Sequence, residues 1–406
     1  MALALTAWGK EGYGHPAAIR IYGERMKNKA VSQESELECT MQEMRVYGVL
    51  LGAAVAVVAC GTAGAGARAQ QPGAVAAAPA RDEDVALEAR LGELARAHHG
   101  KVALYATQLN TGKTASLDPD AVVQTASVIK LTILFEAMEQ VREGKAHWDD
   151  KIALEPGDAV SGSGLLLFLD TPQTLTLKDI LTLMIIMSDN TATNLAMDKI
   201  GLDAVNARIA WMGLKNTHLY KKIGKPATEP MPEDQPKFGL GKTTPREMAE
   251  VMERLGLCEL DHPGRLWAGE RTLAAGGPSA NDQAICGVAM KMLRNQFYRD
   301  TIPRYLEKLD TTETGSGTAS KTGSLNAVRA DVAIVAGKTG PMVLSIFTYE
   351  NADTGWTADN EGELTIAKMA KAIVEAWSPT GIDGKTLVPG LGLPPAGAIG
   401  GAAASN

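Results

Sequence analysis

Strand patterns stand at both ends of the central part of this chain, and helical patterns fill the region between them. The segment "KVALYATQL" from Lys101 predicts a strand, and the "NTGK" turn from Asn110 leads into a second one. Residues 326–350 predict an antiparallel hairpin, whereas apolar residues in 171–310 recur mostly at helical spacing. We therefore predict an α+β fold: a three-layer sandwich with an antiparallel sheet built from both termini and an inserted all-helical subdomain.

Composition divides the chain into four predicted parts. They are a leader and signal peptide (1–69, with the apolar h-region at 46–59), an Ala/Pro-rich linker (70–82), the folded domain (83–378) and a disordered Gly/Ala/Pro-rich tail (379–406). The apolar stretch is too short to span a bilayer but has the length of an h-region. Ala67-Arg68-Ala69 is a candidate cleavage site, and Cys60 after "VVA" is a candidate for lipidation. The protein is thus predicted to be exported and periplasmic, either free or lipid-anchored.

Charge and cysteine usage exclude several classes of function. The formal charge is −7 and no dense basic run is present, which argues against nucleic-acid binding. No H-x-x-H or C-x-x-C pattern occurs, so we expect no metal site. If Cys60 is removed or lipidated, Cys258 and Cys286 remain. An oxidising compartment allows them to pair, and two buried free thiols are the alternative.

The stretch "QTASVIKLTILFEAM" places Ser127 and Lys130 three residues apart at the start of an apolar helical pattern. On a helix, this spacing puts both side chains on one face. A desolvated lysine amine can take the proton that keeps a hydroxyl from being a good nucleophile. Alternatively, Ser127 caps the helix and Lys130 is a solvated charge. One S-x-x-K is expected by chance in about 400 residues, so this motif alone decides nothing.

Two further motifs contain hydroxyl, amide and amine groups. "MSDNTATN" places Ser188, Asp189 and Asn190 between two helical patterns, where they can relay a proton and hold an amide, or simply form a helix cap. "SKTGS" places Lys321, Thr322, Gly323 and Ser324 in a strand, where they suit a ligand carboxylate, or simply form a turn.

The three motifs are unlikely to occur together by chance, because S-D-N and K-T-G are each expected only about 0.05 times per chain of this length. In this order and spacing, with Ser188 standing 61 positions after Ser127, the chain resembles the penicillin-recognising serine enzymes and most closely class A β-lactamases. Similarity also shows in "GKTTPREMAEVMERL" and "MLRNQFYRDTIPRYL". The resemblance covers roughly residues 83–378.

The resemblance implies a role for each motif residue. Ser127 would be the acylated nucleophile, Lys130 its proton acceptor, and Ser188 the donor to the leaving nitrogen. The substrate would be bound by Asn190, Lys321, Thr322, Gly323 and Ser324, and backbone N–H groups of Ser127 and Ser324 would form the oxyanion hole. Arg329 would either add charge for the substrate carboxylate or pair with Asp331.

The chain departs from the class A pattern in the loop between S-D-N and K-T-G. The family's deacylating glutamate usually lies in E-x-x-L-N, and this loop contains no such motif. Glu229, followed by Pro230, is the first candidate for that base because it lies sixteen residues before Pro245. Glu233 is the second candidate, and a chain without an efficient base is the third possibility.

The resemblance therefore implies a serine β-lactamase that hydrolyses β-lactam antibiotics through a Ser127 acyl-enzyme, contributes to antibiotic resistance and needs no cofactor. A D-Ala-D-Ala peptidase or esterase is one alternative, and a penicillin-binding sensor that acylates without efficient turnover is another. A monomer acting on small molecules is expected in each case.

Overall fold

A computed structural model describes residues 82–226, 231–261, 263–264, 278–313 and 315–387. All of them belong to one unit, Pro72–Asn406. The predicted leader with its h-region and Cys60, most of the linker, and residues 388–406 lie outside the described residues. No helix in the described ranges is long and apolar enough to cross a membrane.

The main sheet has six strands in the order β1-β3-β2-β11-β10-β9. They are β1 (Asp82–Glu83), β2 (Lys101–Gln108), β3 (Lys113–Leu117), β9 (Thr318–Leu325), β10 (Val328–Val335) and β11 (Met342–Tyr349). β2 pairs with β11 in antiparallel register from Lys101↔Tyr349 to Gln108↔Met342. The predicted sheet built from both ends of the domain is therefore confirmed, with β9 as an edge strand.

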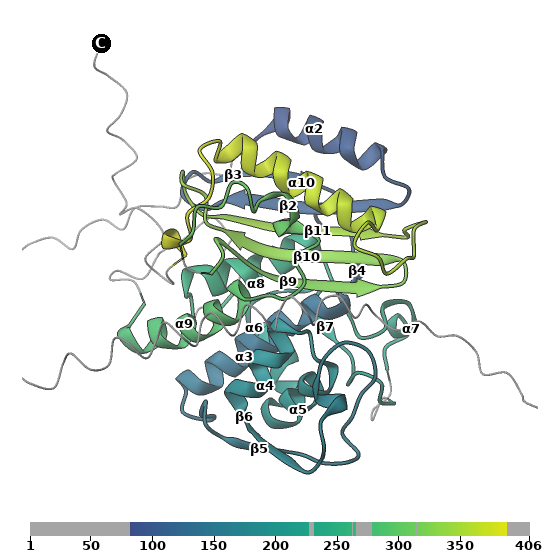
Figure 1. Cartoon of the computed structure of the whole chain (residues 1–406), viewed down its shortest axis with the longest axis vertical. Helices are drawn as coiled ribbons and strands as arrows, with labels where there is room; N and C mark the ends of the chain where they lie inside the picture. Colours follow the sequence, from purple (N-terminus) through teal and green to yellow (C-terminus); the bar gives the residue numbers. More distant parts are fainter. Residues whose placement is uncertain (1–81, 227–230, 262, 265–277, 314, 388–406) are drawn as a thin grey trace, which may run out of the picture. The chain divides into compact units, whose positions relative to one another are not determined.

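Helices cover both faces of this sheet (Figure 1). On one face lie α2 (Val85–Arg96) and α10 (Glu361–Trp377), and on the other lies α8 (Pro245–Leu257), which contacts β2, β10 and β11. Each face of the central strands is thus buried, as the uninterrupted burial of β10 and β11 requires. The three-layer α+β arrangement predicted from the sequence is confirmed.

The chain between β3 and β9 forms the predicted helical part, but the prediction that it is all-helical was wrong, because it also contains two small sheets. Besides α8, its helices are α3 (Lys130–Arg142), α4 (Leu177–Ile186), α5 (Asn190–Ile200), α6 (Leu202–Trp211), α7 (Gln235–Phe238) and α9 (Ala280–Arg294). Short 3-10 helices connect them: η1 (Ala126–Ile129), η2 (Leu166–Phe168) and η3 (Ile302–Tyr305). One small sheet has three strands, in the order β4 (Val123–Gln124), β8 (Gly241–Thr243) and β7 (His218–Leu219). A second small sheet pairs β5 (Lys151–Leu154) with β6 (Gln173–Thr176).

Cys258 and Cys286 form a disulfide between the C-cap of α8 and the middle of α9. The sequence left this pairing open because two cysteines give no information about distance. The bond joins a helix that covers the sheet to a helix that packs on α3 and on β9.

The folded chain extends beyond the predicted boundary at Ser378. Residues 379–387, placed in the disordered tail by composition, include η4 (Gly384–Thr386) and the buried Ile382 and Leu387. Ile382 bridges to Asp310 and Gly337, and its carbonyl accepts a hydrogen bond from Thr311 N. The prediction was wrong here because two isolated apolar residues in a Gly/Ala/Pro-rich sequence carry no periodic signal.

Candidate active site

Ser127 lies in η1, one turn before α3 begins at Lys130. Neither helix has a side-chain cap, so the interpretation of Ser127 as a helix cap is wrong. Ala126 immediately before it has a φ of 43°, a left-handed conformation that costs energy in a non-glycine residue. Ser127 is half-buried, and among the described residues its hydroxyl makes no hydrogen bond. That hydroxyl is therefore available to a ligand.

The Lys130 amine is fully buried and contacts three oxygens. Its Nζ lies 2.7 Å from Ser188 O, 3.1 Å from Ser188 Oγ and 3.1 Å from Asn190 Oδ1. Burial, with the nearby Lys321 charge, holds the pKa of Lys130 well below its usual range, opposed by Asp189. A lysine whose pKa is lowered gives up its proton more readily and can then act as a proton acceptor. The interpretation of Lys130 as a solvated charge is therefore wrong.

Ser188 and Asp189 are held by the loop that contains "SGSG", residues 161–164. Ser188 has a φ of 53°, and its carbonyl accepts a hydrogen bond from Ser163 Oγ at 2.7 Å. Asp189 caps α5 through Ala192 N and also accepts from Leu165 N and Leu166 N. The interpretation of this motif as a helix cap is therefore confirmed for Asp189, while its two neighbours, Ser188 and Asn190, contact Lys130.

Lys321 reaches the same hydroxyl from the sheet. Its Nζ donates to Ser188 Oγ at 3.1 Å and to Thr322 O at 2.8 Å. Ser188 Oγ therefore lies between two amines. When Lys130 is protonated, it donates to all three of its oxygens, and when it is neutral its lone pair can accept the Ser188 hydrogen. This arrangement can pass a proton between Lys130 and Ser188 without any large movement.

A buried carboxyl group lies in the same electrostatic environment. Burial lowers the pKa of Lys321 to about 7, and the charge of Asp331 opposes that shift. Burial likewise raises the pKa of Asp331 to about 6, although its Oδ2 accepts hydrogen bonds from Thr301 Oγ1 and Ile302 N. The sequence did not identify Asp331 as a neighbour of Lys321, because the two are adjacent only through the β9–β10 register, in which Asp331 pairs with Thr322.

The edge strand β9 brings the K-T-G motif to Ser127. A methyl group on Gly323 would lie 3.0 Å from Ser127 N, so the two backbones are in close contact. Leu325 and Val328 flank a two-residue turn and form a hydrogen-bonded pair. Hydrogen-bonded and non-bonded pairs alternate along an antiparallel ladder, so the N–H of Ser324, opposite Arg329, points away from β10 toward the free edge.

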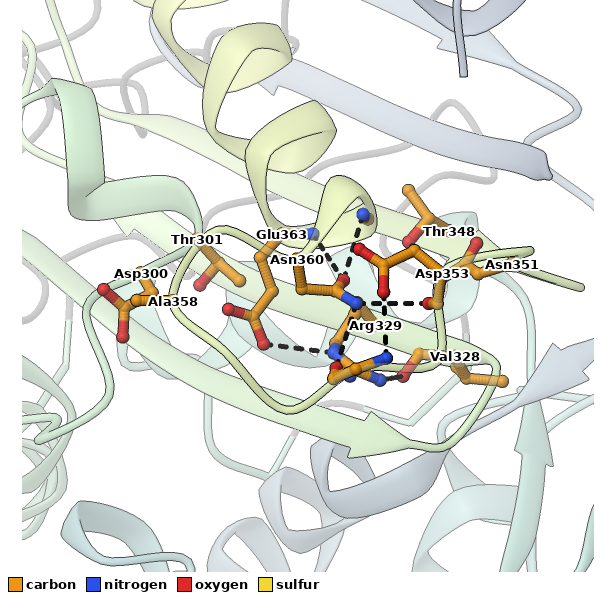
Figure 2. A network of polar contacts seen from close by, with 12 residues as sticks. Asp300, Thr301, Val328, Arg329, Thr348, Asn351, Asp353, Ala358, Asn360 and Glu363 are labelled. Atoms are coloured by element: carbon orange, nitrogen blue, oxygen red, sulfur yellow. Dashed lines mark hydrogen bonds and ion pairs between the residues drawn. The ribbon is translucent and has the colours of Figure 1, made fainter. Parts of the chain in front are cut away.

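Three further residues are candidates for this site. Glu229 lies outside the described residues, and Glu233 is exposed. Arg329 pairs with Glu363 at 3.1 Å instead of with Asp331, and its side chain is fully buried (Figure 2).

The sequence analysis missed Ser163, whose only signal was its place between two glycines. Within the described ranges, no group of three His, Cys, Asp or Glu residues could hold a metal ion.

Comparison with known proteins identifies the family. A model of the β-lactamase enzyme family matches residues 86–377. A β-lactamase from Sphaerobacter thermophilus is 30% identical, with 72% of this chain and 97% of that chain covered and a TM-score of 0.57. No curated protein is significantly similar in sequence. Together with the fold and the serine–lysine cluster, the match shows that this chain belongs to the β-lactamase enzyme family.

Two more distant structures have the same fold. PBP-A is 22% identical, with 74% of this chain and 99% of that chain covered and a TM-score of 0.59. An ancestral class A β-lactamase is 20% identical, with 71% and 99% covered and a TM-score of 0.55. At these identities the similarity concerns the fold alone.

Proposed function

We propose that this chain is a serine β-lactamase that opens β-lactam rings through an ester of Ser127. The observation that carries the proposal is the pair of buried amines, Lys130 and Lys321, on either side of the Ser188 hydroxyl. A structural lysine gains nothing from losing its solvation in this way, whereas a proton relay requires it.

Acylation takes place in two proton-transfer steps that begin and end with neutral Lys130. Ser127 Oγ attacks the lactam carbonyl carbon while its proton moves to neutral Lys130. The backbone N–H groups of Ser127 and Ser324 stabilise the oxyanion. When the C–N bond breaks, Ser188 gives its proton to the leaving nitrogen and regains one from Lys130. The products are a Ser127 ester and an amine, and Lys130 is neutral again.

Substrate binding falls to the groups around this relay. Lys321, when cationic, attracts the substrate carboxylate, and the hydroxyls of Thr322 and Ser324 supply hydrogen bonds to it. Gly323 lets the substrate approach the β9 backbone closely. Asn190 holds the amide of the substrate side chain; its Oδ1 is bound to Lys130 and its Nδ2 donates to Ser161 O at 3.0 Å, so its orientation is fixed beforehand.

Hydrolysis of the ester needs a base for water. We assign this role to Glu229, with Glu233 as the second candidate. Changing Glu229 to Gln is expected to trap the acyl-enzyme without slowing its formation. Unchanged steady-state hydrolysis by that variant would eliminate Glu229.

A penicillin-binding protein with slow turnover is the second candidate function. It is favoured by the segment 217–245, which has no E-x-x-L-N motif. A single-residue mutant of PBP-A has been solved as an acyl-enzyme complex with penicillin G. A D-Ala-D-Ala peptidase or esterase would use the same Ser127.

The proposed location follows from the leader. An exported, periplasmic protein suits a β-lactam substrate, with cleavage after Ala69 or lipidation at Cys60. Loss of palmitate labelling in a Cys60→Ala variant would support the lipid anchor, and equal labelling would exclude it. We expect a monomer.

Intact-mass spectrometry with benzylpenicillin, sampled from seconds to hours while product is assayed, tests the proposal. A transient adduct with steady product release supports a lactamase, and a persistent stoichiometric adduct supports the penicillin-binding alternative. A Ser127→Ala variant should take no adduct. If it retains one, Ser127 is not the nucleophile.

A further inference from the structure

The Arg329 side chain is fully buried in a cage of backbone carbonyls and one carboxylate (Figure 2). Its Nε donates to Glu363 Oε1 at 3.1 Å, and its Nη1 donates to Val328 O at 2.9 Å and to Leu325 O. Its Nη2 donates to Gly355 O. Four of the five N–H groups of the guanidinium are thereby used within the protein.

Arg329 connects three separate segments through these bonds. Leu325 ends β9, Gly355 lies in the loop that follows β11, and Glu363 lies in the first turn of α10. The loop is itself fixed to α10, because Asn360 caps the helix and its Nδ2 donates to Asp353 O and Gly355 O. The end of β9 is therefore tied, through one cation, to a rigid helix terminus.

Ser324 is the residue that this anchoring controls most directly. It precedes Leu325 and lies opposite Arg329 in the ladder, and its N–H points to the free edge of β9. We propose that Arg329 is a positioning residue, which fixes the end of β9 so that the Ser324 N–H is preorganised for the oxyanion. This inference rests on the proposed acylation of Ser127.

The same observations argue against direct binding of the substrate carboxylate by Arg329. The side chain has no exposed surface, and the indole of Trp356 lies over the guanidinium, 4.8 Å from its Cζ to the ring centroid. A carboxylate bound through two N–H groups would have to displace Glu363 or a backbone carbonyl. Lys321 and Thr322 then remain to hold the substrate carboxylate.

Acylation rates with two probes separate these roles. The probes are benzylpenicillin and its methyl ester, which lacks the carboxylate. For Arg329→Gln we expect the acylation rate constant to fall by about tenfold or more with both probes equally, because an oxyanion donor is displaced. The apparent dissociation constant of benzylpenicillin should change little. The matched control is Arg304→Gln, since Arg304 binds Asp359 and Ala358 O of the same loop, and within the described ranges its hydrogen bonds and ion pairs do not involve β9.

Three outcomes would overturn the inference. A loss confined to benzylpenicillin would make Arg329 a carboxylate ligand, and unchanged rates with both probes would leave it no role in acylation. A wild-type chain that is acylated by neither probe would overturn the proposed function and this inference with it. If Arg329→Gln does not fold, the pair Arg329→Gln with Glu363→Gln removes both buried charges together, and the same comparison applies to it.

Discussion

Gly323 on the edge strand and Ser127 in η1 touch through their backbones: a methyl group on Gly323 would lie 3.0 Å from Ser127 N. It would also lie 3.0 Å from Thr125 O. Both neighbours are backbone atoms, which cannot rotate away as a side chain can. The distance between the strand and the nucleophile is therefore set by the absence of a side chain at this position.

Gly323→Ala should separate β9 from η1. We expect a fall in the acylation rate of about tenfold or more from the displaced oxyanion site, and a loss of roughly 1–3 kcal/mol in the free energy of unfolding from overpacking. Stopped-flow acylation and urea unfolding measure the two effects. Gly287→Ala is the control, because nothing lies within 4 Å of the added methyl group, and in helix α9 it should stabilise by about 0.5–1 kcal/mol. Equal acylation by both variants would contradict the close packing described here.

Asp331→Asn should change the pH dependence of carboxylate binding. Lys321 is cationic below its pKa of about 7, so affinity for benzylpenicillin should decline as the pH rises through that value. The Asp331 charge raises the pKa of Lys321. Removing that charge should lower the pKa of Lys321, so the affinity for benzylpenicillin should decline at a lower pH than in the wild type. Profiles of kcat/KM from pH 5 to 9 test this. The methyl ester probe should show no such displacement between wild type and variant, and a displacement of equal size for both probes would assign the titration to another group.

Ser163→Ala should make the position of Ser188 less fixed without unfolding the loop 161–164. The lost hydrogen bond to Ser188 O contributes about 1 kcal/mol, while Asp189 still binds Leu165 N and Leu166 N. We expect acylation to slow by a few-fold, measured by rapid quench and mass spectrometry. Ser116→Ala serves as the control, since it removes a comparable hydroxyl bond to Glu88 outside the site. Equal rates in the two variants would leave Ser163 with no part in the relay.

Removal of the disulfide should affect stability much more than chemistry. Cys258 and Cys286 are 28 residues apart, and closing a loop of that length is expected to stabilise by about 3–4 kcal/mol. The double variant Cys258→Ala/Cys286→Ala should therefore unfold at a lower temperature while keeping its acylation rate at 25 °C. Calorimetry and acylation assays check the two halves. A large loss of acylation in a folded variant would show that α9 controls the position of β9.

The three motifs were visible in the sequence because each is a short local pattern that residue type and spacing alone can identify. Ser127, Lys130, Ser188 and Lys321 could be named, and the strands that carry K-T-G could be drawn from their apolar pattern. What joins the motifs was not visible: the Ser163–Ser188 contact depends on the path of a glycine-containing loop, which has no periodicity.

Arg329 and Asp331 show a second limit of sequence reasoning. Side chains two residues apart on a strand share a face, so a pair between them was a reasonable hypothesis. In the folded protein Glu363 reaches Arg329 from α10, and Thr301 reaches Asp331 from the segment before η3. Tertiary packing decides which helix covers a given strand and which of its residues makes the contact. Local sequence patterns do not predict this.

The pairing of β2 with β11 also sets when this protein can become reactive during its synthesis. Ser127 emerges early, but β9 cannot be held in place before β10 and β11 arrive, and the register joins Lys101 to Tyr349 near the far end of the domain. A partly made chain therefore carries Ser127 without β9 beside it. Contacts of such long sequence separation are slow to form, so β9 takes its place next to Ser127 only after nearly the whole domain has been synthesised.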